Sequence, residues 1–184
     1  IIKRATSDLY KNYEPGDLVY VFGFSRGAAI ARRFAGVLRD TFEALDKSCP
    51  EITFMGVFDT VAALKHPNIF KDHIKPASDV VFENGTVSDV VKKALHMVSL
   101  DDRRIAFYPT LMNRQDGVID EIWLSGAHAD VGGGYRFDGL SDIALSFLID
   151  YIDDNGIDLR KRPALDIDYD DLFDGPEECI RYED

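Results

Sequence analysis

The hydrophobic pattern of the chain changes period at Ser25. Residues 18–24 form an almost unbroken apolar run rich in β-branched and aromatic side chains, which is typical of a strand buried on both faces of a parallel sheet. After Ser25 the apolar side chains recur at helical spacing along one side, which predicts an amphipathic helix. These positions are Ile30, Phe34, Val37 and Leu38. The sequence therefore predicts a strand that turns directly into a helix.

The rest of the chain holds two more apolar runs of strand length and three more segments with helical spacing. The predicted strands cover residues 52–58 and 118–126, and the predicted helices cover residues 1–13, 86–100 and 141 up to a left-handed cap at 155–156. Residues 62–85 have neither period and follow a strand, which favours a lid or a loop that contacts substrate. The long crossovers between strands predict an α/β fold, a parallel sheet with helices on both faces, in a single domain over residues 1–184.

Composition narrows the class of partner. The 46% apolar and 29% charged residues are those of an ordinary globular protein, and the net charge is −12. This charge argues against binding of nucleic acid and gives no attraction to an anionic membrane surface. There is no apolar run of about 18 residues, so we expect no transmembrane segment. Cys49 and Cys179 lack metal-ligand spacing. Free thiols are favoured, although one disulfide stays open.

The joint at residues 23–27 reads Gly-Phe-Ser-Arg-Gly, a Gly-x-Ser-x-Gly match between a strand and a helix. Such a corner strains the backbone of the serine and exposes its side chain above the sheet. We expect Gly23 and Gly27 to be required because a Cβ atom at either position would collide with the neighbouring strand or helix. The helix N-terminus behind Ser25 offers free N–H groups to an oxyanion. The alternative is a serine that merely begins a helix.

Two further polar residues follow predicted strands, namely Asp59 and His128. Parallel strands meet at one carboxyl edge, where ligands bind in open α/β sheets, so Ser25, Asp59 and His128 should converge there. The order serine, acid, histidine is that of α/β-hydrolases. Asp59 could instead cap the next turn, and His128 could be a structural loop residue. His96 is the competing base, although it is expected on a helix, off its apolar stripe.

This arrangement predicts nucleophilic catalysis. His128 would take the proton of the Ser25 hydroxyl, and Asp59 would hold the other ring nitrogen. The N–H of Arg26 is one expected oxyanion donor, and the chemistry would be acyl transfer through an acyl-enzyme. Asp130, Gly132 and Gly133 are expected to support the triad from the loop that carries His128.

We expect neither a cofactor nor a metal site. Metal-dependent hydrolysis through residues 128–130 and the acidic tail, residues 165–184, lacks a third ligand at a sensible spacing.

Five ordered motifs resemble an α/β-hydrolase family, long of unknown function, that includes the first class of type VI secretion phospholipase effectors with a Tle-like catalytic domain. They are Pro-Gly-Asp at 15–17, Gly-Phe-Ser-Arg-Gly-Ala at 23–28, Gly-Val-Phe-Asp-Thr-Val at 56–61, His-Met-Val-Ser-Leu-Asp-Asp-Arg-Arg at 96–104 and Gly-Ala-His-Ala-Asp-Val-Gly-Gly-Gly-Tyr at 126–135. The resemblance implies a phospholipid or another acyl ester as substrate, and Ser25, Asp59 and His128 as the triad. The setting is then cytoplasmic, or that of a secreted effector acting at a target-cell membrane.

Members of that family begin with further strands that this chain is expected to lack. That part should carry a second oxyanion donor and one wall of the acyl pocket, and its absence would leave a strand edge exposed. The expected partners are therefore the substrate together with a secretion apparatus or the missing N-terminal segment. The alternative function is a catalytically idle α/β-hydrolase-fold module for binding or toxin delivery, because a fold alone does not imply activity.

Overall fold

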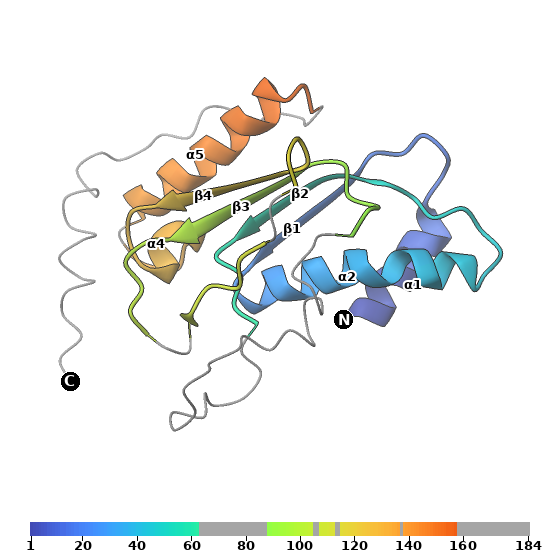
Figure 1. Cartoon of the computed structure of the whole chain (residues 1–184), viewed down its shortest axis with the longest axis horizontal. Helices are drawn as coiled ribbons and strands as arrows, with labels where there is room; N and C mark the ends of the chain where they lie inside the picture. The colour runs from blue at the N-terminus through green and yellow to red at the C-terminus, as the bar shows by residue number, and fades with distance from the viewer. Residues whose placement is uncertain (63–87, 105–106, 113–114, 137, 158–184) are drawn as a thin grey trace.

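The computed structural model describes residues 1–62, 88–104, 107–112, 115–136 and 138–157 and contains a four-stranded sheet, all parallel, in the order β1-β2-β3-β4 (Figure 1). The strands are β1 (Val19–Phe24), β2 (Ile52–Phe58), β3 (Ala94–Ser99) and β4 (Ile119–Leu124). The helices are α1 (Ile2–Asn12), α2 (Arg26–Glu43), α4 (His128–Gly132) and α5 (Gly139–Asp154). The predicted lid and the acidic tail lie outside the described residues. None of the described helices is long and apolar enough to cross a bilayer.

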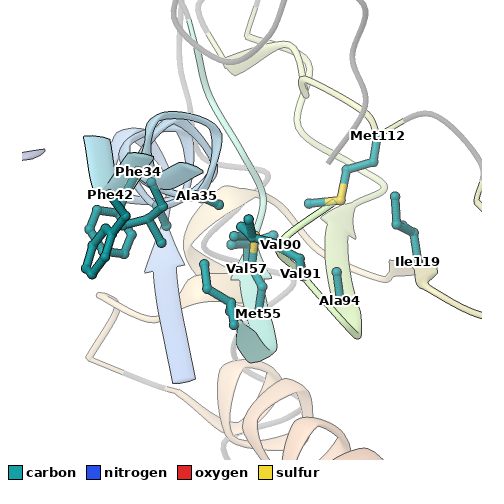
Figure 2. Packing of buried hydrophobic residues seen from close by; sticks show 14 residues of the cluster. Phe34, Ala35, Phe42, Met55, Val57, Val90, Val91, Ala94, Met112 and Ile119 are labelled. Atoms are coloured by element: carbon teal, nitrogen blue, oxygen red, sulfur yellow. The ribbon is translucent and has the colours of Figure 1, made fainter. Parts of the chain in front are cut away.

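Helices cover both faces of the sheet. Because alternate residues of each strand point to opposite sides, neighbouring residues of one strand belong to different cores. Met55 of β2 belongs to a core that α1 and α2 cover, part of which Figure 2 shows. Its neighbour Phe54 belongs to a second core, to which Val131 of α4 and Leu148 of α5 contribute. The predicted α/β fold, a parallel sheet with helices on both faces, is confirmed.

The predicted helix over residues 86–100 is wrong, because this segment supplies strand β3. All six residues of β3 are buried, and it pairs with β2 on one side and β4 on the other. Before it, Ser88 accepts the Val91 N–H in a turn rather than starting a helix. A strand that is buried on both faces need not alternate between apolar and polar residues, and the apolar positions of this segment also fit helical spacing, so spacing alone did not separate strand from helix here.

The strand predicted over residues 118–126 is shorter and less buried than expected. β4 ends at Leu124, and among the described strands it has a partner on one side only. Only Ile119 of β4 is buried, and about half of the Trp123 residue is exposed. The last helix begins at Gly139, and Gly156, with φ of 65°, supplies the left-handed residue expected after it.

The turn from β1 into α2 has the strained backbone that the sequence predicts. Ser25 adopts φ of 58° and ψ of −125°, a conformation that residues with a Cβ rarely adopt. A Cβ added to Gly23 would lie 2.7 Å from both the Ala28 Cα and the Gly27 carbonyl oxygen. A Cβ added to Gly27 would meet nothing within 4 Å. The predicted collision is therefore real at Gly23 and wrong at Gly27.

This difference predicts opposite effects for two alanine substitutions in one motif. Gly23→Ala should lower the free energy of unfolding by about 1–3 kcal/mol, because rigid backbone atoms must move to accept the new methyl group. Gly27→Ala should leave it unchanged or raise it by about 1 kcal/mol, since alanine is the better helix former. Urea unfolding of the full-length protein measures both. Equal losses in the two variants would contradict this assignment.

Candidate active site

The carboxyl edge of the sheet joins Asp59 to His128. Asp59 directly follows β2, its side chain is fully buried, and its Oδ2 lies 2.7 Å from His128 Nδ1. Ser99, the last residue of β3, donates its hydroxyl to Oδ2 at 2.7 Å and its N–H to Oδ1 at 3.1 Å. The interpretation of Asp59 as a cap of its own turn is therefore wrong, because these donors come from β3 and α4.

The His128 ring is fixed in orientation as well as in position. It packs against the Phe24 ring, with centroids 4.5 Å apart, and meets the Phe107 ring edge-on at 4.6 Å. Because Nδ1 donates to the Asp59 carboxylate, the neutral imidazole carries its proton there and leaves Nε2 as an acceptor. Such a histidine can take a proton through Nε2.

Ser25 lies next to the turn of Asp59, since its N–H donates to the Phe58 carbonyl at 3.0 Å and its carbonyl accepts the Val61 N–H at 3.2 Å. The hydroxyl does not cap α2, so the alternative of a serine that only begins a helix lacks its expected hydrogen bond. Phe24 precedes Ser25 and carries the ring against which His128 packs. Within the described residues, hydrogen bonds join His128 to Asp59 but not to Ser25. Catalytic hydrogen bonds often form only when substrate is bound.

Helix geometry leaves the N–H groups of Arg26 and Gly27 without a partner inside α2, because they belong to its first turn. These N–H bonds point toward the N-terminus of the helix, where Ser25 lies, with their positive ends in that direction. The role of the Arg26 N–H as an oxyanion donor stays a prediction.

The three residues expected to support the triad lie in α4 and at its end. Asp130 Oδ2 accepts the Ala127 N–H at 2.7 Å. Gly132 lies against Phe24, since a Cβ there would be 2.1 Å from that ring. Gly133 ends α4 with φ of 85°. Each residue thus shapes α4 or its contact with Phe24, and support of the triad stays a prediction. Among the described residues, no group of three or more His, Cys, Asp or Glu side chains could hold a metal ion.

The comparisons with known proteins identify the family. Residues 2–42 and 39–151 match the family model described as the type VI secretion phospholipase effector Tle1-like catalytic domain. The chain belongs to this family. Its motifs and elements can therefore be compared with those of other Tle1-like catalytic domains.

Two relatives show how much of a longer protein this chain matches. The uncharacterized protein YEL023C of Saccharomyces cerevisiae is 29% identical over 141 residues, which cover 54% of this chain and 19% of that protein. A crystal structure of an uncharacterized Pseudomonas aeruginosa protein aligns with a TM-score of 0.50 and 25% identity, over 80% of this chain and 26% of that one. This Tle1-like chain thus spans about a fifth to a quarter of the length of these relatives.

Sequence reasoning missed two residues that contact the candidate site, Ser99 and Asp102. The carboxylate of Asp102 accepts the backbone N–H of His128 at 3.2 Å and pairs with Arg104 at 2.6 Å. Burial opposes ionisation of Asp102, but hydrogen bonds from Arg104 and the His128 N–H outweigh it and lower its pKa. The signal that could have indicated Asp102 is the charged run at residues 101–104, directly after a buried segment.

His96 is not a competing base, and its expected position on a helix is wrong. It lies in β3 with 0% of its surface exposed. Its Nε2 accepts the Thr60 N–H at 3.1 Å, and its Nδ1 lies 2.8 Å from Glu121 Oε2. Both ring nitrogens are therefore occupied. Burial lowers the pKa of His96, against the opposing effect of its hydrogen bond to Glu121.

The lowered pKa of His96 predicts a pH dependence of stability. Folding favours the neutral His96 ring. The contribution of His96 to the free energy of unfolding should therefore be complete above the unfolded pKa of about 6.5, and it should be lost as pH falls through the lower folded pKa. His96→Gln removes the titration and keeps an acceptor for Thr60. The free energy of unfolding, measured by urea between pH 7.5 and 5, should fall more steeply in the wild type than in this variant. Parallel curves would contradict the prediction.

The ring contact between Phe107 and His128 predicts that alanine substitutions at Phe107 and at its neighbour Tyr108 have different effects on the NMR signals of His128. Phe107→Ala removes the ring that meets His128 edge-on, so the ring-proton resonances of His128 should shift toward their unstacked values. Tyr108→Ala is the matched control, because Tyr108 is 65% exposed. Proton NMR of the full-length protein should show the shift in the first variant only, and the same spectrum in both would contradict the contact.

Proposed function

We propose that this chain is the catalytic part of a serine carboxylic-ester hydrolase that acts on a phospholipid or another acyl ester. The proposed triad is Ser25, His128 and Asp59, which supply the nucleophile, the base and the acid. The observation that carries the proposal is the 2.7 Å contact between buried Asp59 and His128 beside the strained turn of Ser25. Membership of a phospholipase effector family supports a hydrolase acting on lipid.

The proposed reaction begins when the Ser25 hydroxyl attacks the acyl carbonyl carbon and His128 Nε2 takes its proton. The Arg26 N–H stabilises the negative charge on the carbonyl oxygen. The tetrahedral intermediate collapses to an acyl-enzyme, and His128 returns the proton to the leaving alcohol. Water then repeats the sequence and releases the carboxylic acid. Throughout, Asp59 holds Nδ1 and stabilises the imidazolium.

The activity, substrate and partners of the whole protein belong to this proposal too, because the chain covers only 19% and 26% of two relatives. Further parts of the protein would supply a second oxyanion donor and the rest of the acyl pocket. A secretion apparatus is the proposed partner if the protein is a secreted effector that reaches a target-cell membrane. The competing function is an idle module for binding or delivery.

A fluorophosphonate probe separates the two functions, because its phosphorus bonds to an activated serine oxygen and releases fluoride. In the full-length protein we expect labelling at Ser25, located by mass spectrometry, and none in Ser25→Ala. His128→Ala should lower the rate of labelling by a factor on the order of 10⁴ to 10⁶, and Asp59→Asn should lower it by a somewhat smaller factor.

Ser125→Ala is the matched control, since Ser125 is an exposed serine after β4 and its loss should leave labelling unchanged. A folded wild-type protein that resists the probe would favour the idle module instead. A label that persists in Ser25→Ala would contradict the assignment of Ser25 as the nucleophile.

A further inference from the structure

Glu121 of β4 and His96 of β3 form a second carboxylate–histidine pair. It is linked to Asp59 through the N–H of the next residue, Thr60. Glu121 Oε2 also accepts the Met112 N–H at 2.9 Å, so this oxygen serves as an acceptor. The Thr60 N–H can bond only to an unprotonated ring nitrogen, so the proton of His96 sits on Nδ1 and points at Glu121. The pair thus presents one acceptor, Nε2, to the backbone.

The amide held by His96 belongs to the peptide that follows Asp59. On the other side of Asp59, its own N–H donates to the Met97 carbonyl at 2.7 Å. The peptide planes before and after the carboxylate are therefore each fixed by a hydrogen bond to β3. Together they determine the backbone angles of Asp59 and the direction of its side chain.

This backbone requires support, because Asp59 has φ of 36°. A non-glycine residue in that region costs about 1–3 kcal/mol and keeps its conformation only where its surroundings impose it. Without Nε2, the buried Thr60 N–H would lose its acceptor, and the turn could relax away from the strained conformation.

A buried cation, Arg32, strengthens the same turn. The Thr60 carbonyl accepts the Thr110 N–H at 2.8 Å. The Arg32 guanidinium, fully buried in α2, donates to the carbonyls of Thr110 and Leu111. Burial lowers the pKa of Arg32 to about 10, so it stays charged near neutral pH. The charged groups that face His96 are Glu121, Arg32 and Asp59.

We propose that His96, held by Glu121, is a positioning residue: through the Thr60 amide it fixes the strained backbone that aims the Asp59 carboxylate at His128. The inference rests on the proposed function, since it assigns His96 to the geometry of the same site. His96 touches no reacting atom. Its contribution lies in the alignment of the acid with the base.

Two substitutions of similar polarity separate positioning from general stability. In His96→Gln the side-chain oxygen reaches the place of Nε2 and can accept the Thr60 N–H. In His96→Asn the shorter side chain matches the Nδ1 end, so it contacts Glu121 and leaves Thr60 without an acceptor. In the full-length protein, we expect His96→Gln to keep kcat for an acyl ester within about threefold, against a loss of about 10²-fold in His96→Asn at unchanged KM.

The hydrogen-bonded Nδ1 proton of His128 gives a readout that needs no activity. Its low-field proton NMR resonance should persist in His96→Gln and weaken or vanish in His96→Asn. Equal kcat and the same resonance in the two folded variants would overturn the positioning role. A wild type without esterase activity, whose variants still differ in this resonance, would overturn the proposed function and leave the positioning intact.

If His96→Asn does not fold, Glu121→Gln takes its place. It keeps the shape of the side chain and removes the charge that holds the proton on Nδ1. We expect about a tenfold loss of kcat at unchanged KM and a weaker His128 resonance. Unchanged kcat in a folded Glu121→Gln protein would overturn the proposal.

Discussion

A buried carboxylate needs hydrogen-bond donors from the protein in place of water. Asp59 accepts three such hydrogen bonds, and they organise the site. Two come from Ser99 at the end of β3, and one comes from His128 at the start of α4. Leaving such a charge without partners would cost several kcal/mol, on the order expected for a broken buried ion pair. The need to satisfy Asp59 therefore ties the loop after β4 to the middle of the sheet.

The two strained corners of the sheet also form one unit. Ser25 and Asp59 follow the neighbouring strands β1 and β2, and both have positive φ. The Ser25 N–H donates to the Phe58 carbonyl, and the Ser25 carbonyl accepts the Val61 N–H. A shift of one turn must move the other, so the strain at each corner is restrained by the same ladder of hydrogen bonds that continues from the paired strands.

The sequence was informative where a local pattern and a long-range arrangement agree. The runs at 18–24 and 52–58 have an unambiguous strand character, and residues that follow parallel strands meet at one edge, so the contact between Asp59 and His128 could be anticipated. The apolar positions in the segment with His96 fit helical spacing although it forms a strand, because β3 is buried on both faces and does not alternate between apolar and polar residues. The partners of His96 also lie 25 and 36 residues away, and no local rule links them.

The two histidines differ in chemistry because of what surrounds each ring rather than what each ring is. Both donate Nδ1–H to a carboxylate, which fixes Nε2 as the acceptor. In His96, Nε2 is occupied by the Thr60 amide, and a proton there would break that bond in a site closed to water. In His128, a proton on Nε2 breaks no hydrogen bond within the described residues, and Asp59 stabilises the resulting charge. The free second nitrogen makes His128 suited to proton transfer, whereas the occupied one makes His96 suited to holding the backbone.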